Sequence, residues 1–196
     1  MHYIRAVMSE LQFAFFDTAI GRCGIVWSAR GIAAVRFPER GDDAVRNRIA
    51  RRFPDAREAA PPEKTQRAID DIVALLNGEA RDLRDIEIDL GDAPDFNRRV
   101  YDIARSIGPG ETLTYGEVAE RLGDRNLARD VAQALGQNPV PIIVPCHRVM
   151  AAGRKTGGFS APGGVATKLK LLSIEGAKLE DTPMLFDRLP LLVKRI

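Results

Sequence analysis

Pro145-Cys146-His147-Arg148-Val149 is the most informative stretch of this chain, and it follows Asn138-Pro139 and the apolar run Val140 to Val144. The apolar run predicts a short buried strand, with the cysteine at its end. Thiolate is the reactive form of cysteine, and cationic neighbours favour it. A proline directly before the cysteine stiffens the backbone and has no amide hydrogen to pair in a sheet. The pattern therefore predicts a sulfur that is presented to a reactant.

A core cysteine is the competing interpretation of Cys146, because free cysteines are among the most often buried residues and most are inert. Adjacency in the sequence also does not bring the two side chains of Cys146 and His147 together, since neighbouring residues in a strand point to opposite faces. Cys146 and His147 can therefore interact only if the strand breaks here or if a water molecule bridges the two groups. The surrounding sequence has to decide between the two interpretations.

The chain has 196 residues, of which 45% are hydrophobic. It can therefore build one domain, or a small domain beside one of ordinary size. No apolar run is long enough to span a membrane, and residues 1–10 lack the apolar segment of a signal peptide. We therefore expect a cytoplasmic protein with no membrane partner. Thiols stay reduced in the cytoplasm, so a disulfide between Cys23 and Cys146 is not expected.

Metal binding has little support in the sequence. There are two cysteines and two histidines, His2 and His147, and neither a CxxC nor an HxxxH spacing occurs. Cys23 stands at the start of an apolar run and is interpreted as a core residue. We therefore expect no metal site and no cofactor.

Positive charge is concentrated around Cys146, although the net charge of the whole chain is only +2. Residues 125–174 have a balance of +6, because they contain one acid, Asp130, and seven basic residues: Arg125, Arg129, Arg148, Arg154, Lys155, Lys168 and Lys170. A solvated basic surface is one interpretation of this cluster. A nucleic-acid-binding surface is the other, because clustered cations are the usual electrostatic feature of such proteins.

The first ninety residues predict a small sheet with helices beside it. Turn signals at residues 20–22 and 30–31 separate three short apolar runs, which are expected to form strands over 11–17, 23–29 and 32–37. Apolar residues at helical spacing predict helices over 42–53 and 63–77. Alternating apolar and acidic residues predict an edge strand over 86–90, and residues 91–95 form a natural boundary.

The second part of the chain predicts mostly helices. Asp95 is expected to cap a helix that Gly108-Pro109-Gly110 ends. Thr114 and Glu117 form the pattern of a capping box, which opens a short helix, and another helix is expected over 126–135. Two short helices joined by a tight turn resemble a helix-turn-helix, although helical hairpins of this size are also common packing units. The chain continues with a glycine-rich loop and a last helix, expected over 153–164 and 165–175.

Taken together, these features resemble the methylated-DNA–protein-cysteine methyltransferases, the suicide repair proteins for 6-O-alkylguanine. The segment Asn138 to Val149 resembles the active-site signature of that family. Thr114-Tyr115-Gly116-Glu117 resembles the start of the family's helix-turn-helix, and Ala128-Arg129-Asp130-Val131 resembles its arginine-bearing recognition helix. Gly163-Gly164 and Lys168 to Glu175 resemble its C-terminal loop and helix.

The resemblance is strong over about residues 94–177 and weak over 1–90, and it implies an α+β architecture. Residues 1–93 are implied to form a domain with a small sheet and flanking helices, similar to ribonuclease H. Residues 94–196 are implied to form a mainly helical domain with a helix-turn-helix, similar to winged-helix proteins. The resemblance also implies a monomer that acts on double-stranded DNA containing alkylated guanine.

The family's chemistry implies a role for each residue of the motif. Cys146 is implied to be the alkyl acceptor in an irreversible, single-turnover reaction. His147 is implied to act as a base, through a water molecule, while Glu175 holds the imidazole in the correct tautomer. Tyr115 is implied to donate a proton or a hydrogen bond to the departing guanine, and Asn138 to brace the turn beside the site.

The target base has to be flipped out of the duplex, and Arg129 is implied to fill the gap. In this family the recognition helix lies in the minor groove, unlike that of most helix-turn-helix proteins, and its small residues permit close approach. The implied DNA-binding residues are Thr114, Ala128, Arg129, Ala132 and Gln133. The implied substrate-binding residues are Val149, Phe159 and Ser160.

Three features depart from the family pattern. Ala132-Gln133 stands where paired small residues are usual, Phe159 replaces the common tyrosine, and Ala161-Pro162 is inserted before Gly163-Gly164. Because Phe159 has no hydroxyl, Ser160 becomes the expected side-chain donor to the base. The alternative is that Phe159 is a core anchor and the insertion is harmless, since loops usually tolerate insertions. The zinc site of some eukaryotic members has no ligands in this sequence.

Three other functions compete with this one. A non-catalytic sensor of alkylated DNA lacks the acceptor thiol, so Cys146 argues against it. A thiol hydrolase that uses Cys146, His147 and Glu175 explains neither Arg129 nor the helix-turn-helix. A transcription factor that senses alkylation through Cys146 needs a further DNA-binding domain, which the first ninety residues do not resemble.

Overall fold

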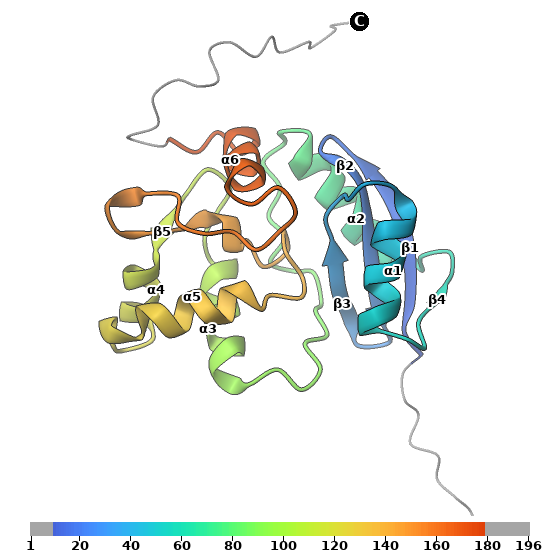
Figure 1. Cartoon of the computed structure of the whole chain (residues 1–196), viewed down its shortest axis with the longest axis horizontal. Helices are drawn as coiled ribbons and strands as arrows, with labels where there is room; N and C mark the ends of the chain where they lie inside the picture. Colours follow the sequence, from blue (N-terminus) through green and yellow to red (C-terminus); the bar gives the residue numbers. More distant parts are fainter. Residues whose placement is uncertain (1–9, 179–196) are drawn as a thin grey trace, which may run out of the picture.

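The computed structural model describes residues 10–178, and the expectations for His2 and for most of residues 1–10 fall outside that range. A sheet part, formed by residues 12–76, lies beside a helical part, formed by residues 95–174 (Figure 1). The architecture is therefore a mixed α+β fold with a small sheet, as predicted. Within residues 10–178, no helix combines the length and the apolar character that crossing a membrane requires.

Four strands form the sheet in the order β3-β2-β1-β4. They are β1 (Gln12–Thr18), β2 (Gly21–Ser28), β3 (Gly31–Arg36) and β4 (Arg57–Glu58). The pairs β1–β2 and β2–β3 are antiparallel, and β4 runs parallel to β1. Gly31 opens β3 with a φ of 134°, which glycine adopts without strain. The three predicted strands are confirmed, with ends shifted by one or two residues.

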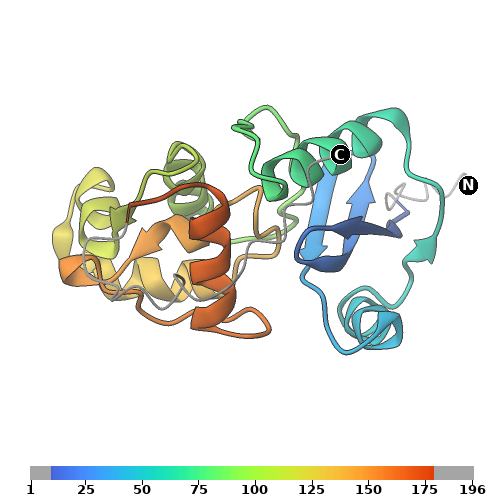
Figure 2. The ribbon, with the colours of Figure 1, turned by 90° about the horizontal axis from the view of Figure 1, so that it is seen from above.

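Two helices cover opposite faces of this sheet (Figure 2). They are α1 (Asp42–Arg52) and α2 (Glu63–Leu76), which match the predicted helices to within one residue. Val45 and Ile49 of α1 pack in a small cluster with Val26 of the sheet. Ile69 and Ile72 of α2 belong to the larger core, which continues without a break into the helical part. The sheet part is thus packed against the segment that carries Cys146.

The edge strand predicted over 86–90 is wrong, because only Ile88 forms a bridge, to Ile32 of β3. The Ile32 amide donates to the Glu87 carbonyl at 2.9 Å, and the Asp89 amide donates to the Ile32 carbonyl at 2.8 Å. Asp89 explains why the pairing stops there. Its carboxylate accepts hydrogen bonds from Ser28 and Arg30, so the chain is drawn to the β2–β3 turn instead of continuing along β3.

The helical part holds four α-helices, three 3₁₀ turns and one short parallel strand pair among the described residues. The helices are α3 (Asp95–Arg105), α4 (Tyr115–Arg121), α5 (Ala128–Gly136) and α6 (Val165–Ile174). The 3₁₀ turns are η1 (Arg125–Leu127), η2 (Cys146–Arg148) and η3 (Ala152–Arg154), and the strands are β5 (Leu113–Thr114) and β6 (Val149–Met150). The short pair β5–β6 was not predicted, because two-residue strands carry no periodicity.

The two predicted helix starts have different outcomes. The capping box is confirmed: the Glu117 amide donates to Thr114 Oγ1 at 3.2 Å, and the Thr114 amide donates to Glu117 Oε2 at 2.6 Å. Asp95 is not a cap, because Pro94 holds the N-cap position and no side chain caps this helix. Asp95 instead lies in the first turn, where its charge favours the helix dipole. The predicted helix over 126–135 begins as η1 and becomes α-helical at Ala128.

Candidate active site

The apolar run Val140 to Val144 is buried but is not a strand, so that prediction is wrong. It forms a tight turn in which the Val144 amide donates to the Val140 carbonyl at 2.9 Å. Asn138 closes this turn from inside: its Oδ1 accepts from the Val140 amide at 3.0 Å, and its Nδ2 donates to the Val144 carbonyl at 2.8 Å. Ile142 has a φ of 77°, which is rare for a β-branched residue. The turn is therefore held by side-chain hydrogen bonds and burial.

Cys146 begins the 3₁₀ turn η2 directly after this segment. The extended backbone that would separate Cys146 from His147 is therefore absent at this point. Cys146 is partly exposed, whereas His147 and Arg148 are buried. Asn138 Nδ2 lies 3.4 Å from Cys146 Sγ, so the amide that closes the turn also contacts the sulfur. The Asn138 amide therefore positions both the turn and the Cys146 sulfur.

A buried network of three charged or titratable side chains lies behind the cysteine. Glu175, at the end of α6, accepts hydrogen bonds from Arg148 Nε and Nη2 at 2.9 and 2.8 Å, and its Oε1 lies 2.9 Å from His147 Nε2. Arg148 also donates to the Ile107 carbonyl. Burial works to raise the pKa of Glu175, but the hydrogen bonds and charges of His147 and Arg148 outweigh it and lower the pKa to about 2. Glu175 is therefore a carboxylate at neutral pH.

His147 is 1% exposed, and burial lowers its pKa, so the neutral imidazole is favoured. Because ionised Glu175 can only accept hydrogen bonds, we assign the imidazole proton to Nε2. Nδ1 is then a lone-pair acceptor, and it has no hydrogen-bond partner among the described residues. Among the same described residues, the imidazole and the Cys146 thiol do not share a direct hydrogen bond. A bridging water molecule is the arrangement that would connect them.

Lys168 is a further residue of this site, although no role at the site was predicted for it from the sequence. Its side chain is fully buried, Nζ donates to the Val149 carbonyl at 2.6 Å, and Nζ lies 5.9 Å from the centre of the Tyr115 ring. Burial lowers the pKa of Lys168 to about 8, although Cys146 works to raise it. Burial also raises the pKa of Cys146, while Asn138 and the charge of Lys168 act to lower it. Lys168 therefore favours the thiolate.

A cavity of about 430 Å³ borders the cysteine, and we call it the base cavity. Its lining residues come from α4, α5, η2 and the glycine-rich loop: Tyr115, Ala132, Leu135, Gly136, Cys146, Gly158, Phe159 and Ser160. Burial raises the pKa of Tyr115, and the charge of Cys146 adds to this effect, so Tyr115 keeps its proton at neutral pH. Gly157 of this loop has a φ of 63°, which glycine adopts without strain.

The loop residues Phe159 and Ser160 each have a second contact. The ring of Phe159 lies edge-on to that of Phe37, with 6.0 Å between the centroids, so it packs against the sheet part and also lines the base cavity. Ser160 Oγ donates to the Gly136 carbonyl at 3.3 Å. Val149, by contrast, is buried in the core and lines neither this cavity nor the one described below.

The residues implied to bind DNA lie on α4 and α5 or at their starts. Arg129 and Gln133 are exposed, whereas Thr114, Ala128 and Ala132 are half-buried. Arg129 has no hydrogen-bond or ion-pair partner among the described residues, so its side chain is available to a ligand. The basic cluster is smaller at the surface than the sequence indicates, because Arg148 and Lys168 are buried.

Known proteins resemble this chain in sequence. The model of the family "6-O-methylguanine DNA methyltransferase, DNA binding domain" matches residues 95–177. A methylated-DNA–protein-cysteine methyltransferase of Methanothermobacter thermautotrophicus is 36% identical over 157 residues, which cover 80% of this chain and 81% of that protein. A protein of the same name from Mycobacterium tuberculosis is 41% identical over 120 residues, which cover 61% of this chain and 70% of the relative.

Solved structures resemble this chain along most of its length. The O6-methylguanine methyltransferase of Mycobacterium tuberculosis superimposes with a TM-score of 0.69 and 32% identity, covering 85% of this chain and 93% of that one. A crystal structure of Mycobacterium tuberculosis OGT in complex with DNA gives a TM-score of 0.68 and 32% identity, covering 84% and 92% of the two chains.

Proposed function

Since the chain belongs to the methylated-DNA–protein-cysteine methyltransferases, we propose that Cys146 is the residue that accepts the alkyl group. The protein repairs DNA directly, by moving an alkyl group from 6-O-alkylguanine in DNA to one of its own cysteines. One observation carries the assignment to Cys146. Its sulfur borders the base cavity together with Tyr115 and is contacted by Asn138.

The proposed reaction is a displacement at a saturated carbon. The Cys146 sulfur attacks the alkyl carbon in line with the guanine oxygen, so the S–C bond forms as the C–O bond breaks. The electron pair of the broken bond moves onto the base, and Tyr115 supplies a proton or hydrogen bond to it. His147 takes the thiol proton through a water molecule at Nδ1, because Nε2 is bound to Glu175. Glu175 thereby fixes the tautomer that the base requires.

The base enters the cavity only after it leaves the duplex. We propose that Arg129, which is exposed and unpartnered among the described residues, fills the gap in the stack. Ala128 and Ala132 present short side chains on the same helix and permit close approach to the groove. Thr114 and Gln133 are the further proposed DNA contacts, and Phe159 and Ser160 the proposed contacts to the flipped base.

The reaction is proposed to stop after one turnover. A thioether is stable, and the second cysteine of the chain, Cys23, is fully buried in the core beside β1 and α2. Burial raises the pKa of Cys23 to about 11, so it supplies no thiolate that could resolve the product. Each chain should therefore accept one alkyl group.

We also propose the finer features of the architecture. Residues 1–93 form a ribonuclease-H-like domain, and residues 94–196 form a winged-helix-like domain; residues 1–9 and 179–196 of these ranges lie outside the described residues. The order β3-β2-β1-β4 and the pair of helices α4 and α5 support this division. We propose that the protein is a monomer. We also propose that it is cytoplasmic, since both cysteines are free thiols, which the cytoplasm maintains.

Incubation with a duplex that carries labelled 6-O-methylguanine tests the assignment. Mass spectrometry should find the mass of one methyl group on the protein, on the peptide that contains Cys146, even with excess substrate. Cys146→Ser should lose transfer and still bind DNA, whereas the matched control Cys23→Ala should keep transfer. Label on another residue, or several turnovers per chain, would overturn the proposal. A protein that binds the lesion without taking the label would be a damage sensor instead.

A further inference from the structure

A second cavity borders Cys146, and it lies between the sheet part and the helical part. Its volume is about 300 Å³. It shares five lining residues with the base cavity: Leu135, Gly136, Cys146, Phe159 and Ser160. These shared residues form the common wall of the two cavities, so the acceptor sulfur borders both. Two of the three features that departed from the family pattern, Phe159 and Ala161-Pro162, line this second cavity.

The sheet part gives this second cavity a positive charge. Arg36 of β3 and Arg48 and Arg52 of α1 line it, together with one acid, Glu39. Arg48 Nε lies 2.6 Å from Glu39 Oε1, so this pair is neutral and two guanidinium groups remain. We call this space the arginine cavity.

Arg36 is the inner cation of the arginine cavity, and its hydrogen bonds are incomplete. Nη1 donates to the Val35 and Pro139 carbonyls at 3.0 and 3.2 Å, whereas the buried Nε has no partner among the described residues. Burial lowers the pKa of Arg36, and the like charges of Arg48 and Arg52 add to this effect. The like charges of Arg36, Arg48 and Arg52 repel one another, and an anion in the cavity would offset this repulsion.

We propose that the arginine cavity receives the alkyl substituent of the lesion and favours substituents that end in a carboxylate, such as a carboxymethyl group. This inference rests on the proposed function. When the base occupies the base cavity and the sulfur attacks in line, the remainder of the alkyl group projects sideways from the reacting carbon. The arginine cavity also borders Cys146 and is open to this substituent. A methyl group does not extend into it, so methyl transfer does not depend on its charge.

The reaction balances as it does for a methyl group. The Cys146 sulfur bonds to the methylene carbon, the bond from that carbon to the guanine oxygen breaks, and the base takes the electron pair and a proton. The carboxylate takes no part in bond making and stays on the transferred carbon, as S-carboxymethylcysteine. The arginines act through charge, because they attract the substituent while the carbon is positioned.

Two duplexes that differ only at the lesion test this proposal. One carries 6-O-carboxymethylguanine, and the other carries the uncharged amide of the same shape, 6-O-carbamoylmethylguanine. With saturating protein, the measured quantity is the ratio of their single-turnover rate constants, carboxylate over amide. Arg52→Gln should lower this ratio by about two- to fivefold, as expected for one exposed charge. Glu39→Gln should raise the ratio, because it removes the acid and frees Arg48.

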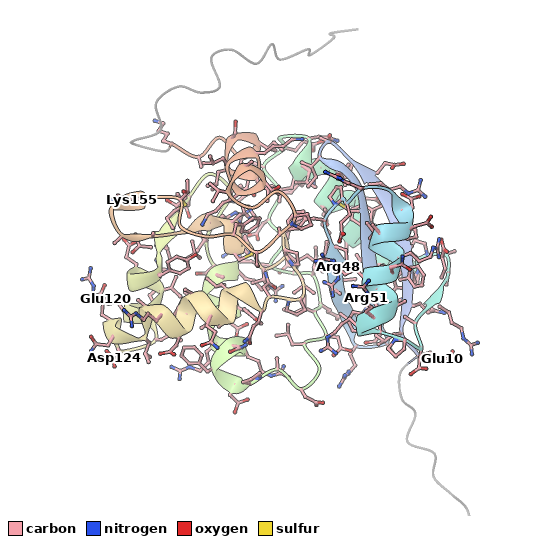
Figure 3. All side chains as sticks on the ribbon, viewed as in Figure 1. Glu10, Arg48, Arg51, Glu120, Asp124 and Lys155 are labelled. Atoms are coloured by element: carbon pink, nitrogen blue, oxygen red, sulfur yellow. The ribbon has the colours of Figure 1, made fainter. Side chains whose placement is uncertain are left out.

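Arg51→Gln is the matched control. Arg51 lies on the same helix as Arg48 (Figure 3) and carries the same charge, but it does not line the cavity. Its loss should leave the ratio unchanged. Equal ratios in the Arg52, Glu39 and Arg51 variants would overturn the proposal. A third duplex, with 6-O-methylguanine, separates a failure of this proposal from a failure of the proposed function. If methyl is transferred but the ratio does not change in the variants, only the role of the arginine cavity is refuted. If no methyl is transferred, the proposed function is refuted.

Discussion

Replacing Arg148 tests the buried network directly. Arg148→Met removes two hydrogen bonds to Glu175 and one to the Ile107 carbonyl, and it leaves a buried carboxylate with His147 as its remaining partner. Removing one member of a buried ion pair costs about 3–5 kcal/mol of folding free energy. We therefore expect a loss of this size near pH 7, measured as a lower urea midpoint with an unchanged slope.

The pH dependence of that loss has a definite sign. Glu175 has a folded pKa of about 2 against an ordinary value of 4.5, which corresponds to about 3 kcal/mol of stability. Because the folded pKa is lowered, this stability is fully present above pH 4.5 and is lost as the pH falls towards 2. The parent loses it on acidification, whereas the variant has only the part that His147 supplies. The difference between the two proteins should therefore shrink as the pH falls to 3, by at most about 2 kcal/mol.

The control is Arg22→Met, which removes one member of the exposed pair with Asp42, 3.2 Å apart. Its effect should be small, because surface pairs contribute little. The reasoning about the network fails if Arg148→Met costs less than about 1 kcal/mol, or if its cost is the same near pH 7 and near pH 3.

Three further predictions concern transfer itself. Arg129→Ala should slow repair in duplex DNA far more than reaction with free 6-O-benzylguanine, because unstacking a base costs a few kcal/mol; equal slowing of both would exclude a role in flipping. Phe159→Ala should slow reaction with the free base and also lower the melting temperature, since the ring contacts both the base cavity and Phe37; a lower melting temperature alone would leave Phe159 a core anchor. Lys168→Met should shift the pH–rate profile to higher pH, because the Cys146 thiol loses a nearby cation; a lower rate with an unshifted profile would exclude this positioning role.

In the sheet part, the strands β1 to β3 and the helices α1 and α2 were predictable because each has a local signal, whereas the two-residue strand β4 (Arg57–Glu58) was not predicted. Glycines at the two turns separate the strands, and apolar residues at helical spacing mark α1 and α2. The capping box at Thr114 was predictable for the same reason, since both partners lie within one turn. The N-cap at Asp95 failed because a suitable residue type is only a statistical preference, and Pro94 takes that position in the structure.

The turn before the cysteine could not be predicted from its own residues. A short apolar run fits a buried strand and a buried turn equally well, because both leave the side chains away from water. The segment becomes a turn because the Asn138 side chain forms hydrogen bonds at both ends of the run, in place of those that a neighbouring strand would form. The turn also depends on β3, since the Val35 amide and Arg36 Nη1 donate to the Pro139 carbonyl. These contacts join segments about a hundred residues apart.

The basic residues around Cys146 divide into two groups that the sequence does not distinguish. Counted along the chain, Arg148 and Lys168 look like surface charge. In the fold each has a buried anionic or carbonyl partner from a distant segment, Glu175 for the first and the Val149 carbonyl for the second. His147 and Arg148 together keep Glu175 ionised, and ionised Glu175 leaves His147 Nδ1 as a lone-pair acceptor. The charge of Lys168 acts to lower the pKa of the Cys146 thiol. In the proposed reaction the two buried cations therefore act on the same proton transfer from opposite ends, whereas exposed Arg129 is proposed to act on the DNA.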